Sequence, residues 1–398
     1  MYRLINPIRD YAWGSLTAIP ELLGTEPDGR PAAELWLGAH PSAPSAVVTP
    51  LGERPLDRVI AEDPDGALGR DVVARFGPSL PYLLKVIAAA RPLSLQVHPH
   101  LDQAREGYDA EEAAGVPVAA SSRNYKDRNH KPELIYALTN FEALCGFRAP
   151  RRAAELLSGL EAPLAIALAA VLQREPTYRG IRTAFRRLLD PDLRPEASQI
   201  AEVVAASARR LEEGSPSPRA DRTVVRLAEH YPDDPGVIVS LLLNPVTLQP
   251  GEAMFVPAGG VHAYLHGVGL EVMANSDNVL RAGLTGKHID VPELLAAVDY
   301  VAAPPVRIAP ESRNAVSRVF YAPVDDFELS VTQVTDGGVH RLPGRGPRVL
   351  LCLDGALTLT DAGGADLTLT RGASAFAAAS DGVLAVRGNG TLVQADVP

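Results

Sequence analysis

Three polar side chains share one face of a predicted strand in the N-terminal half of the sequence. In the segment LSLQVHP, strand alternation places Ser94, Gln96 and His98 on one face and Leu95 and Val97 on the other. Polar side chains inside an apolar core need partners, and a metal ion with a substrate would supply them. The alternative is the solvated face of an exposed strand, which the strongly apolar neighbouring segments disfavour.

Two further side chains of metal-ligand type lie far away in the sequence. Glu133 begins a predicted strand, ELIYAL, where a buried carboxylate requires a cation, although a structural salt bridge would also satisfy it. His262 follows the segment PAGG, in which Pro257 fixes φ and the pair Gly259-Gly260 tolerates positive φ. Such a turn would aim the histidine into a barrel. Two imidazoles and a carboxylate suit zinc.

A polar segment rich in cations, NSDNVLRAGLTGKH, follows this histidine. It contains Asp277, Arg281 and Lys287 but few apolar residues that could be buried. The fixed charge of Arg281 could stabilise or orient an anion, whereas the structural alternative is an ion pair with Asp277, four residues earlier. The sequence alone leaves both interpretations open.

The elements that must position these groups are mostly strands. Residues 81–100 read as two buried strands around a turn at Arg91-Pro92, and EAMFVPA reads as a short strand. Residues 149–236 are predicted to be helical, because their apolar residues recur at helical spacing. One predicted apolar stripe consists of Ile200, Val203, Val204 and Leu211. Residues 311–398 return to short β segments separated by turns.

The turn around His262 is similar to the second motif of the cupin barrels, in which the corresponding histidine binds a metal. One departure is His266, at a position where cupins often have asparagine. We therefore expect a mainly β protein with two cupin, jelly-roll-like barrels and an α-helical domain. The predicted divisions are a catalytic barrel in two parts (1–148 and 237–305), a helical insertion (149–236) and a C-terminal cupin-like barrel (306–398). The last should bind no metal, because GASAFAAASDG contains no histidine.

Composition limits the class of protein. The chain has 398 residues, enough for two or three domains, and a net charge of −10 that disfavours a nucleic-acid partner. Its two cysteines, Cys145 and Cys352, are far apart and favour a reducing compartment. No secretory signal is recognisable, and no apolar run is long enough to span a membrane. We expect a cytoplasmic monomer.

Taken together, the motifs resemble those of the type I mannose-6-phosphate isomerases, also called phosphomannose isomerases. The resemblance covers nearly the whole chain, and its motifs occur in family order: YAWGS, AELWLGAHPSAPS, LPYLLKVIAAARPLSLQVHP, NHKPELIYAL, PAGGVHAYL and MANSDNVLRAGLT. It implies an enzyme of mannose metabolism and GDP-mannose biosynthesis that interconverts mannose 6-phosphate and fructose 6-phosphate through a cis-enediol. Several linked motifs make the resemblance specific.

The resemblance also implies roles for individual residues. One zinc ion per chain would be held by Gln96, His98, Glu133 and His262. Catalytic roles would fall to Arg281, which suits charge stabilisation, and to Lys131 and Glu271, either of which could move protons. Ser94 and Lys287 are the expected contacts to the phosphate or hydroxyl groups of the substrate. The identity of the base stays open.

Two other classes compete with this interpretation. A metal-dependent cupin dioxygenase would favour histidines and a carboxylate around iron, so the glutamine and the neighbouring cations argue against it. A non-catalytic, metal-binding bicupin would have no reason to carry the group Lys131, Glu271 and Arg281. A fused nucleotidyltransferase is disfavoured, since no glycine-rich nucleotide loop followed by basic residues is present at the N-terminus.

Overall fold

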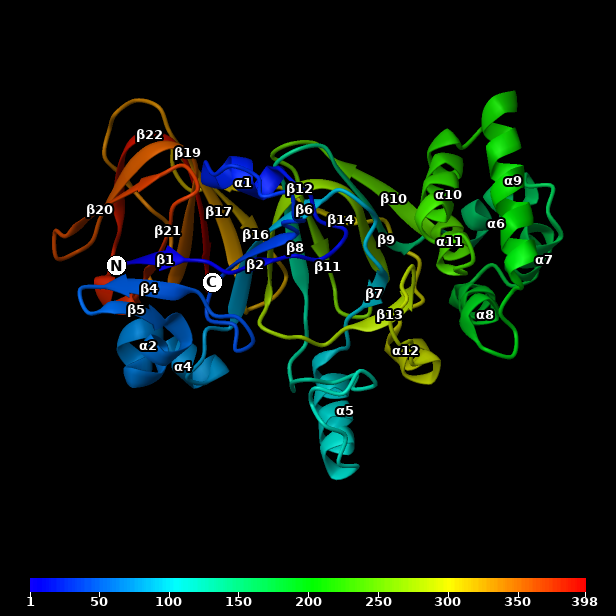
Figure 1. Ribbon diagram of the computed structural model, residues 1–398, viewed down its shortest axis with the longest axis horizontal. Coiled ribbons are helices and arrows are strands. Elements are labelled where there is room, and N and C mark those ends of the chain that lie inside the picture. Colours follow the sequence, from blue (N-terminus) through cyan, green and yellow to red (C-terminus); the bar gives the residue numbers. More distant parts are fainter.

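A computed structural model describes all residues 1–398. Two large antiparallel sheets lie side by side and a bundle of helices packs at one end, as Figure 1 shows. This arrangement confirms the predicted mainly β fold of two cupin-type barrels with a helical insertion. None of the helices is both long and apolar enough to cross a membrane.

The central sheet carries the residues predicted to do chemistry. Its long strand β12 (His262–Ala274) pairs with β6 and β8 along its second half and with β7 and β9 near its start. The pairing of β12 with β9 is irregular between Tyr264 and His266, just before β12 changes partners, and such a bulge bends the strand. The other strands are β2 (Ile8–Arg9), β3 (Glu34–Leu37), β6 (Tyr82–Ala89), β7 (Leu95–Val97), β8 (Glu133–Ala137), β9 (Phe141–Phe147), β10 (Leu243–Leu248), β11 (Ala253–Val256), β13 (Leu280–Gly283) and β14 (Val306–Ile308).

The second sheet joins both ends of the chain. Strand β1 (Tyr2–Ile5) pairs with β21 (Ser374–Ala377) on one side and with β4 (Ala46–Thr49) on the other. The prediction placed residues 1–148 in the catalytic barrel and did not anticipate that β1 and β4 join the C-terminal sheet. Strand pairing over such a distance leaves no local signal in the sequence. The other strands are β5 (Gly52–Pro55), β15 (Glu311–Ser312), β16 (Ser317–Tyr321), β17 (Glu328–Val334), β18 (His340–Arg341), β19 (Arg348–Thr360), β20 (Asp366–Thr370) and β22 (Ala385–Asp396).

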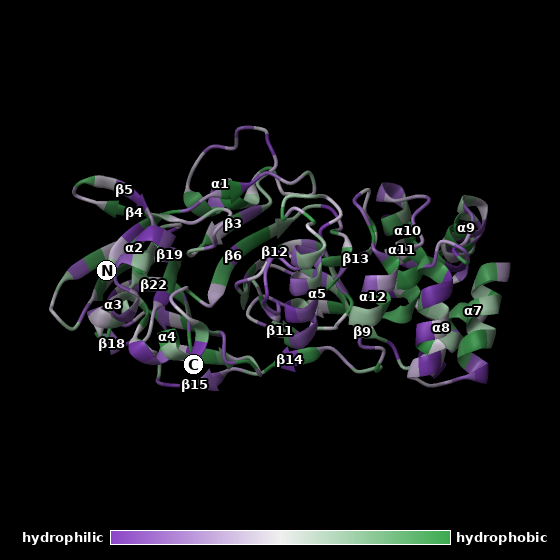
Figure 2. Ribbon diagram, turned by 90° about the horizontal axis from the view of Figure 1, so that it is seen from below, coloured by the Kyte–Doolittle hydropathy of each residue, from purple (hydrophilic) through white to green (hydrophobic).

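Helices fill the segment in which the sequence predicted them. Ile200 and Val203 of α9 are fully buried, as the apolar spacing indicated, and Val204 packs against the same core. In Figure 2 the strands β6 and β12 are green along most of their length, whereas these helices alternate green and purple. The helices are α6 (Pro150–Ser158), α7 (Pro163–Arg174), α8 (Tyr178–Leu189), α9 (Ala197–Glu213), α10 (Pro218–His230) and α11 (Gly236–Val239), followed by the 3-10 turn Ser240–Leu242.

The remaining helices lie on or beside the two sheets. Helix α5 (Leu101–Ala113) projects below the central sheet in Figure 1, near α12 (Val291–Ala297). The others are α1 (Ala18–Leu23), α2 (Leu56–Glu62), α3 (Pro64–Leu68) and α4 (Arg70–Phe76), with a second 3-10 turn at Ala379–Asp381.

Candidate metal centre

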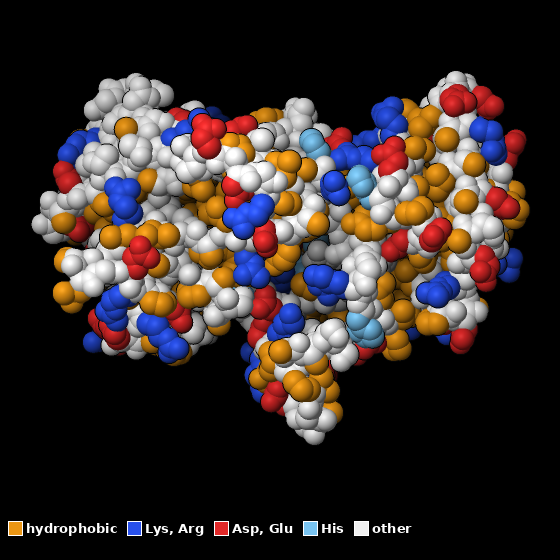
Figure 3. Space-filling model, in the orientation of Figure 1, with side chains coloured by type: hydrophobic (Ala, Val, Ile, Leu, Met, Phe, Trp, Pro, Cys, Tyr) orange, Lys and Arg blue, Asp and Glu red, His pale blue; other side chains and the backbone are white.

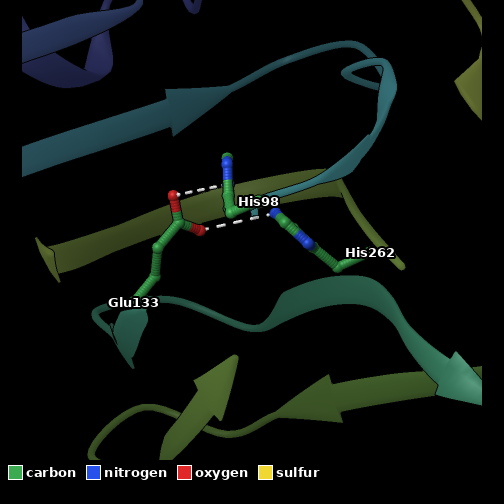
Figure 4. A group of neighbouring side chains, drawn as sticks. All are labelled: His98, Glu133 and His262. Carbon is green, nitrogen blue, oxygen red and sulfur yellow. Dashed lines mark ion pairs between the residues drawn. The ribbon is translucent and has the colours of Figure 1, made fainter. Parts of the chain in front are cut away.

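His98, Glu133 and His262 converge inside the central sheet. His98 follows β7, Glu133 begins β8 and His262 begins β12, so strand pairing brings three distant segments together (Figure 4). The two carboxylate oxygens of Glu133 lie 3.1 Å from Nε2 of His98 and 3.4 Å from Nε2 of His262. All three residues are buried, and their ligand atoms lie within 4.8 Å of one another.

Backbone carbonyls orient both imidazoles. Nδ1 of His98 lies 2.8 Å from the carbonyl oxygen of Asn278, and Nδ1 of His262 lies 3.0 Å from that of Gly260. A carbonyl can only accept a hydrogen bond, so each Nδ1 carries the proton and each Nε2 presents a lone pair toward Glu133. Nε2 of His98 accordingly has no hydrogen-bond partner. Two lone pairs facing a buried carboxylate repel it, and a cation between them would remove the repulsion.

Burial keeps His98 uncharged. Desolvation lowers the pKa of its imidazole to about 4, against the opposing effect of the Glu133 carboxylate. The ring is therefore neutral near pH 7, which is the form that binds metals.

The glycine turn before β12 fixes the position of both histidines. Gly259 has φ +76°, and its backbone N–H donates a 2.8 Å hydrogen bond to the carbonyl oxygen of His98. A Cβ at this residue would lie 2.7 Å from Nε2 of His100. Glycine is therefore required here both by φ and by space, as the sequence predicted for this turn.

Gln96 reaches the same cavity. It lies opposite His262 in the β7–β12 pairing and lines a cavity of about 50 Å³ together with Glu133, His262 and Glu271. Its Nε2 donates a 3.2 Å hydrogen bond to Oγ of Ser94, which leaves Oε1 as the free acceptor of the amide. Ser94 thus orients Gln96, a contact that the one-face alternation of the strand implied.

Lys131 and Glu271 belong to one buried network of charges. Nζ of Lys131 lies 3.5 Å from Glu133, and Oε2 of Glu271 accepts a 3.1 Å hydrogen bond from Nζ of Lys85. Lys85 also lies 4.0 Å from Glu34. Our sequence analysis missed Lys85 and Glu34. A signal was available, because Lys85 is the only charged residue in the uniformly buried strand β6.

The pKa values in this network follow from its charges. Burial raises the pKa of Glu271, as does the charge of Glu133, whereas Lys85 opposes both. Burial lowers the pKa of Lys85, but the carboxylates Glu34 and Glu271 outweigh it and the net shift is upward. Lys85 is therefore an ammonium at neutral pH. Tyr264 completes the group, with its hydroxyl 3.2 Å from Oε2 of Glu133.

Arg281 and Lys287 lie at the rim. Arg281 is half-buried, and it is the cross-strand neighbour of Gln96 in the pairing of β13 with β7. Burial lowers the pKa of its guanidinium group. Lys287 is exposed, with Nζ 5.9 Å from the centre of the Tyr11 ring, and its pKa is lowered by burial and then by the cations Arg281 and Lys126. The charge of Arg281 thus reaches Lys287, which places the two predicted cations in one region of the molecule.

Asp277 does not pair with Arg281. Its carboxylate lies 3.5 Å from Nε2 of the buried His40 instead. The structural alternative that the sequence left open for Arg281 therefore lacks its partner. In the C-terminal sheet the single histidine, His340, pairs with Asp336 at 2.8 Å.

Two antiparallel barrels, one of them enclosing a His–Glu–His group, define a bicupin with a site of metal-ligand type. The chain belongs to the type I phosphomannose isomerase family, as its sequence motifs indicated. Residues 1–150 match the model for the catalytic domain of phosphomannose isomerase type I. Mannose-6-phosphate isomerase of Escherichia coli K12 is 43% identical over 399 residues, covering 99% of each chain. Mannose-6-phosphate isomerase 1 of Arabidopsis thaliana is 34% identical over 92% of this chain and 86% of its own.

Solved structures agree with these relatives. A mutant of phosphomannose isomerase from Salmonella typhimurium superposes with a TM-score of 0.91 and 39% identity, covering 100% of this chain and 99% of that one. A zinc-bound mannose 6-phosphate isomerase superposes with a TM-score of 0.90 at the same identity and coverage. The cupin-type fold therefore extends over the whole chain.

Proposed function

We propose that this protein is a zinc-dependent mannose-6-phosphate isomerase, an enzyme that interconverts mannose 6-phosphate and fructose 6-phosphate through a cis-enediol. The proposed metal binding rests on one observation: the Nε2 atoms of His98 and His262 both direct a lone pair toward the buried Glu133. The full-length identity with mannose-6-phosphate isomerases supports the reaction and its substrates.

The donor set fits one zinc ion. His98, Glu133 and His262 would supply three ligands, and Oε1 of Gln96 would supply the fourth from the same cavity. When bound, zinc supplies a Lewis acid that stabilises negative charge on substrate oxygens. The hydrogen bonds from the two Nδ1 atoms to backbone carbonyls would hold the imidazoles in place for this role.

The phosphate would lie at the rim, beside the cations. The charge of Arg281 lowers the pKa of Lys287, after burial, and a phosphate dianion would relieve this repulsion. Arg281 would in addition stabilise the negative charge of the enediolate, because it pairs across the strands with Gln96. Ser94 would orient Gln96 and contact a hydroxyl group.

The proton must move between adjacent carbons of the open-chain sugar. Lys131 and Glu271 are our two candidates for this step. Glu271 is held by Lys85 at 3.1 Å, whereas Lys131 lies 3.5 Å from Glu133, within the metal-ligand group. The raised pKa of Glu271 makes its carboxyl group a better proton acceptor than an ordinary glutamate.

A coupled assay that detects fructose 6-phosphate tests the reaction. Zinc-loaded protein should convert mannose 6-phosphate, and unphosphorylated mannose should react far more slowly because it lacks the anion. Oxygen uptake without isomerisation would instead identify a cupin oxygenase, and the absence of any turnover would identify a binding protein.

We also propose that the enzyme acts as a cytoplasmic monomer. Both cysteines are unpaired and buried, which supports a reducing compartment. Light scattering on the purified protein would contradict the monomer if it gave twice the chain mass.

A further inference from the structure

A second cavity lies where the helical unit meets the central sheet. It has a volume of about 590 Å³, and helix α10 forms one wall while β9, β10 and the first part of β12 form the other. It shares no lining residue with the cavity that contains Glu133 and Glu271. Figure 3 shows Lys and Arg side chains gathered at the notch between these two parts of the molecule. A cavity of this size can hold a small organic molecule.

Three arginines of α10 line this cavity from one face of the helix. Arg219, Arg222 and Arg226 are spaced by three and four residues, which places them on neighbouring turns. Another face of α10 is apolar: Ala220 and Val224 are buried in the core. Like charges at these spacings repel one another, so this face is destabilised unless an anion is close.

The protein itself supplies too few anions. Arg226 binds Glu142 at 2.7 Å and also donates to the carbonyl oxygen of Leu265, but neither Arg219 nor Arg222 has a carboxylate at ion-pairing distance. Arg219 donates only to the hydroxyl of Thr247. Glu229 is the other carboxylate in the lining, so the three guanidinium groups face two carboxylates.

A fourth arginine adds to the imbalance. The pKa of Arg148 is lowered by burial and by the charge of Arg219, and its Nε is buried without a hydrogen-bond partner. Burial lowers the pKa of Arg219, the charge of Glu142 opposes this shift, and the charge of Arg307 adds to it. Arg307 itself pairs with Glu252 at 2.8 Å. Positive charge therefore exceeds negative charge at this junction, although Glu142 and Glu252 compensate part of it.

We propose that this cavity binds a small phosphorylated organic molecule, held by Arg219 and Arg222 and distinct from the sugar phosphate at the metal centre. A guanidinium fork matches the geometry of a phosphate better than that of any neutral group. Pro92, Val246 and Leu265 give the cavity an apolar wall, which fits an organic group attached to the phosphate. Arg226 connects the site to β12 at Leu265, three residues after His262.

Titration with phenyl phosphate, an anion that joins a phosphate to an apolar ring, tests the site in the purified full chain. Calorimetry should show binding at this cavity in addition to any at the rim of the metal centre. The double variant Arg219→Ala/Arg222→Ala should lose the additional binding or weaken it by about tenfold or more. Arg187→Ala, which removes an exposed arginine of α8, is the matched control and should bind like the wild type.

Crystals soaked in tungstate, a heavy analogue of phosphate, locate the anion directly. We expect anomalous density between Arg219 and Arg222 in the wild type. If the double variant fails to fold, Arg222→Glu at the exposed position replaces it and should also abolish binding. Identical isotherms in all variants, or tungstate only beside Arg281 and Lys287, would overturn the proposal.

Discussion

Arg281 lies directly opposite Gln96 in the pairing of β13 with β7. The side chains of cross-strand partners project from the same side of a sheet. The guanidinium group of Arg281 and the amide of Gln96, which we assign to the metal, therefore lie on the same face. Sequence separation conceals this relationship, since the two residues belong to different motifs. It explains how a half-buried arginine can act at the metal centre while its neighbour Asp277 binds His40.

Replacing Arg281 by alanine should lower turnover by roughly a hundredfold or more, because charge stabilisation in the transition state would be lost. Zinc content and the circular dichroism spectrum should stay unchanged. Arg281→Lys should recover only part of the activity, since a point charge cannot reproduce the planar fork. Near-normal turnover with only a raised Michaelis constant would restrict Arg281 to phosphate binding.

Removal of metal should abolish activity. Treatment with a chelator empties the site, and adding zinc should restore turnover in proportion to the zinc bound, measured by atomic absorption. His98→Ala should prevent this recovery because it deletes one ligand. Full activity in rigorously metal-free protein would disprove the proposed mechanism.

One metal ion should bind per chain, all of it in the central barrel. The C-terminal sheet offers His340 alone, already bound to Asp336, and a single histidine is insufficient for zinc. His340→Ala should therefore retain the full zinc content, whereas His262→Ala should not. A ratio near two, with an ion in each barrel, would refute this prediction.

The C-terminal sheet should lose stability as the pH rises. Asp396 and Glu328 are buried opposite each other on β22 and β17, and burial followed by the charge of Glu328 raises the pKa of Asp396 well above 3.8. The folded state then holds a proton that the unfolded state releases, so the free energy of unfolding falls as pH rises from about 4 toward the raised pKa.

Asp396→Asn removes this titration. Its Tm should exceed that of the wild type by an amount that grows as the pH rises above about 4, measured by calorimetry. Glu311→Gln, an exposed carboxylate of the same sheet, serves as the control and should change little. A difference in Tm that does not vary with pH would contradict the proposed protonation of Asp396 in the folded state.

Local pattern was enough to predict much of the central barrel. The alternation in LSLQVHP and the glycine turn before His262 report backbone geometry, so the positions of these side chains could be read from neighbouring residues. The assignment of Gln96 needed the family resemblance, because an amide in a strand has many structural uses. The apolar spacing in α9 likewise identified its buried face.

Contacts between segments that are distant in the chain could not be predicted from the sequence. Lys85 was overlooked because a lysine inside an apolar strand makes sense only when Glu34 and Glu271, from two other strands, are beside it. The sequence also left open whether Asp277 pairs with Arg281, and the structure places the carboxylate beside His40, which comes from a distant loop. Such contacts depend on the whole sheet rather than on any one segment.

The pairing of β1 with β21 has a consequence for the order of folding. During synthesis the first strand leaves the ribosome long before its partner exists, since Tyr2 pairs with Phe376 near the other end of the chain. The C-terminal sheet therefore cannot close until translation is almost finished, although most strands of the central sheet precede it in the sequence. Nascent chains stalled before residue 374 should expose β1 to protease, and they would depend on chaperones to keep its unpaired edge from aggregating.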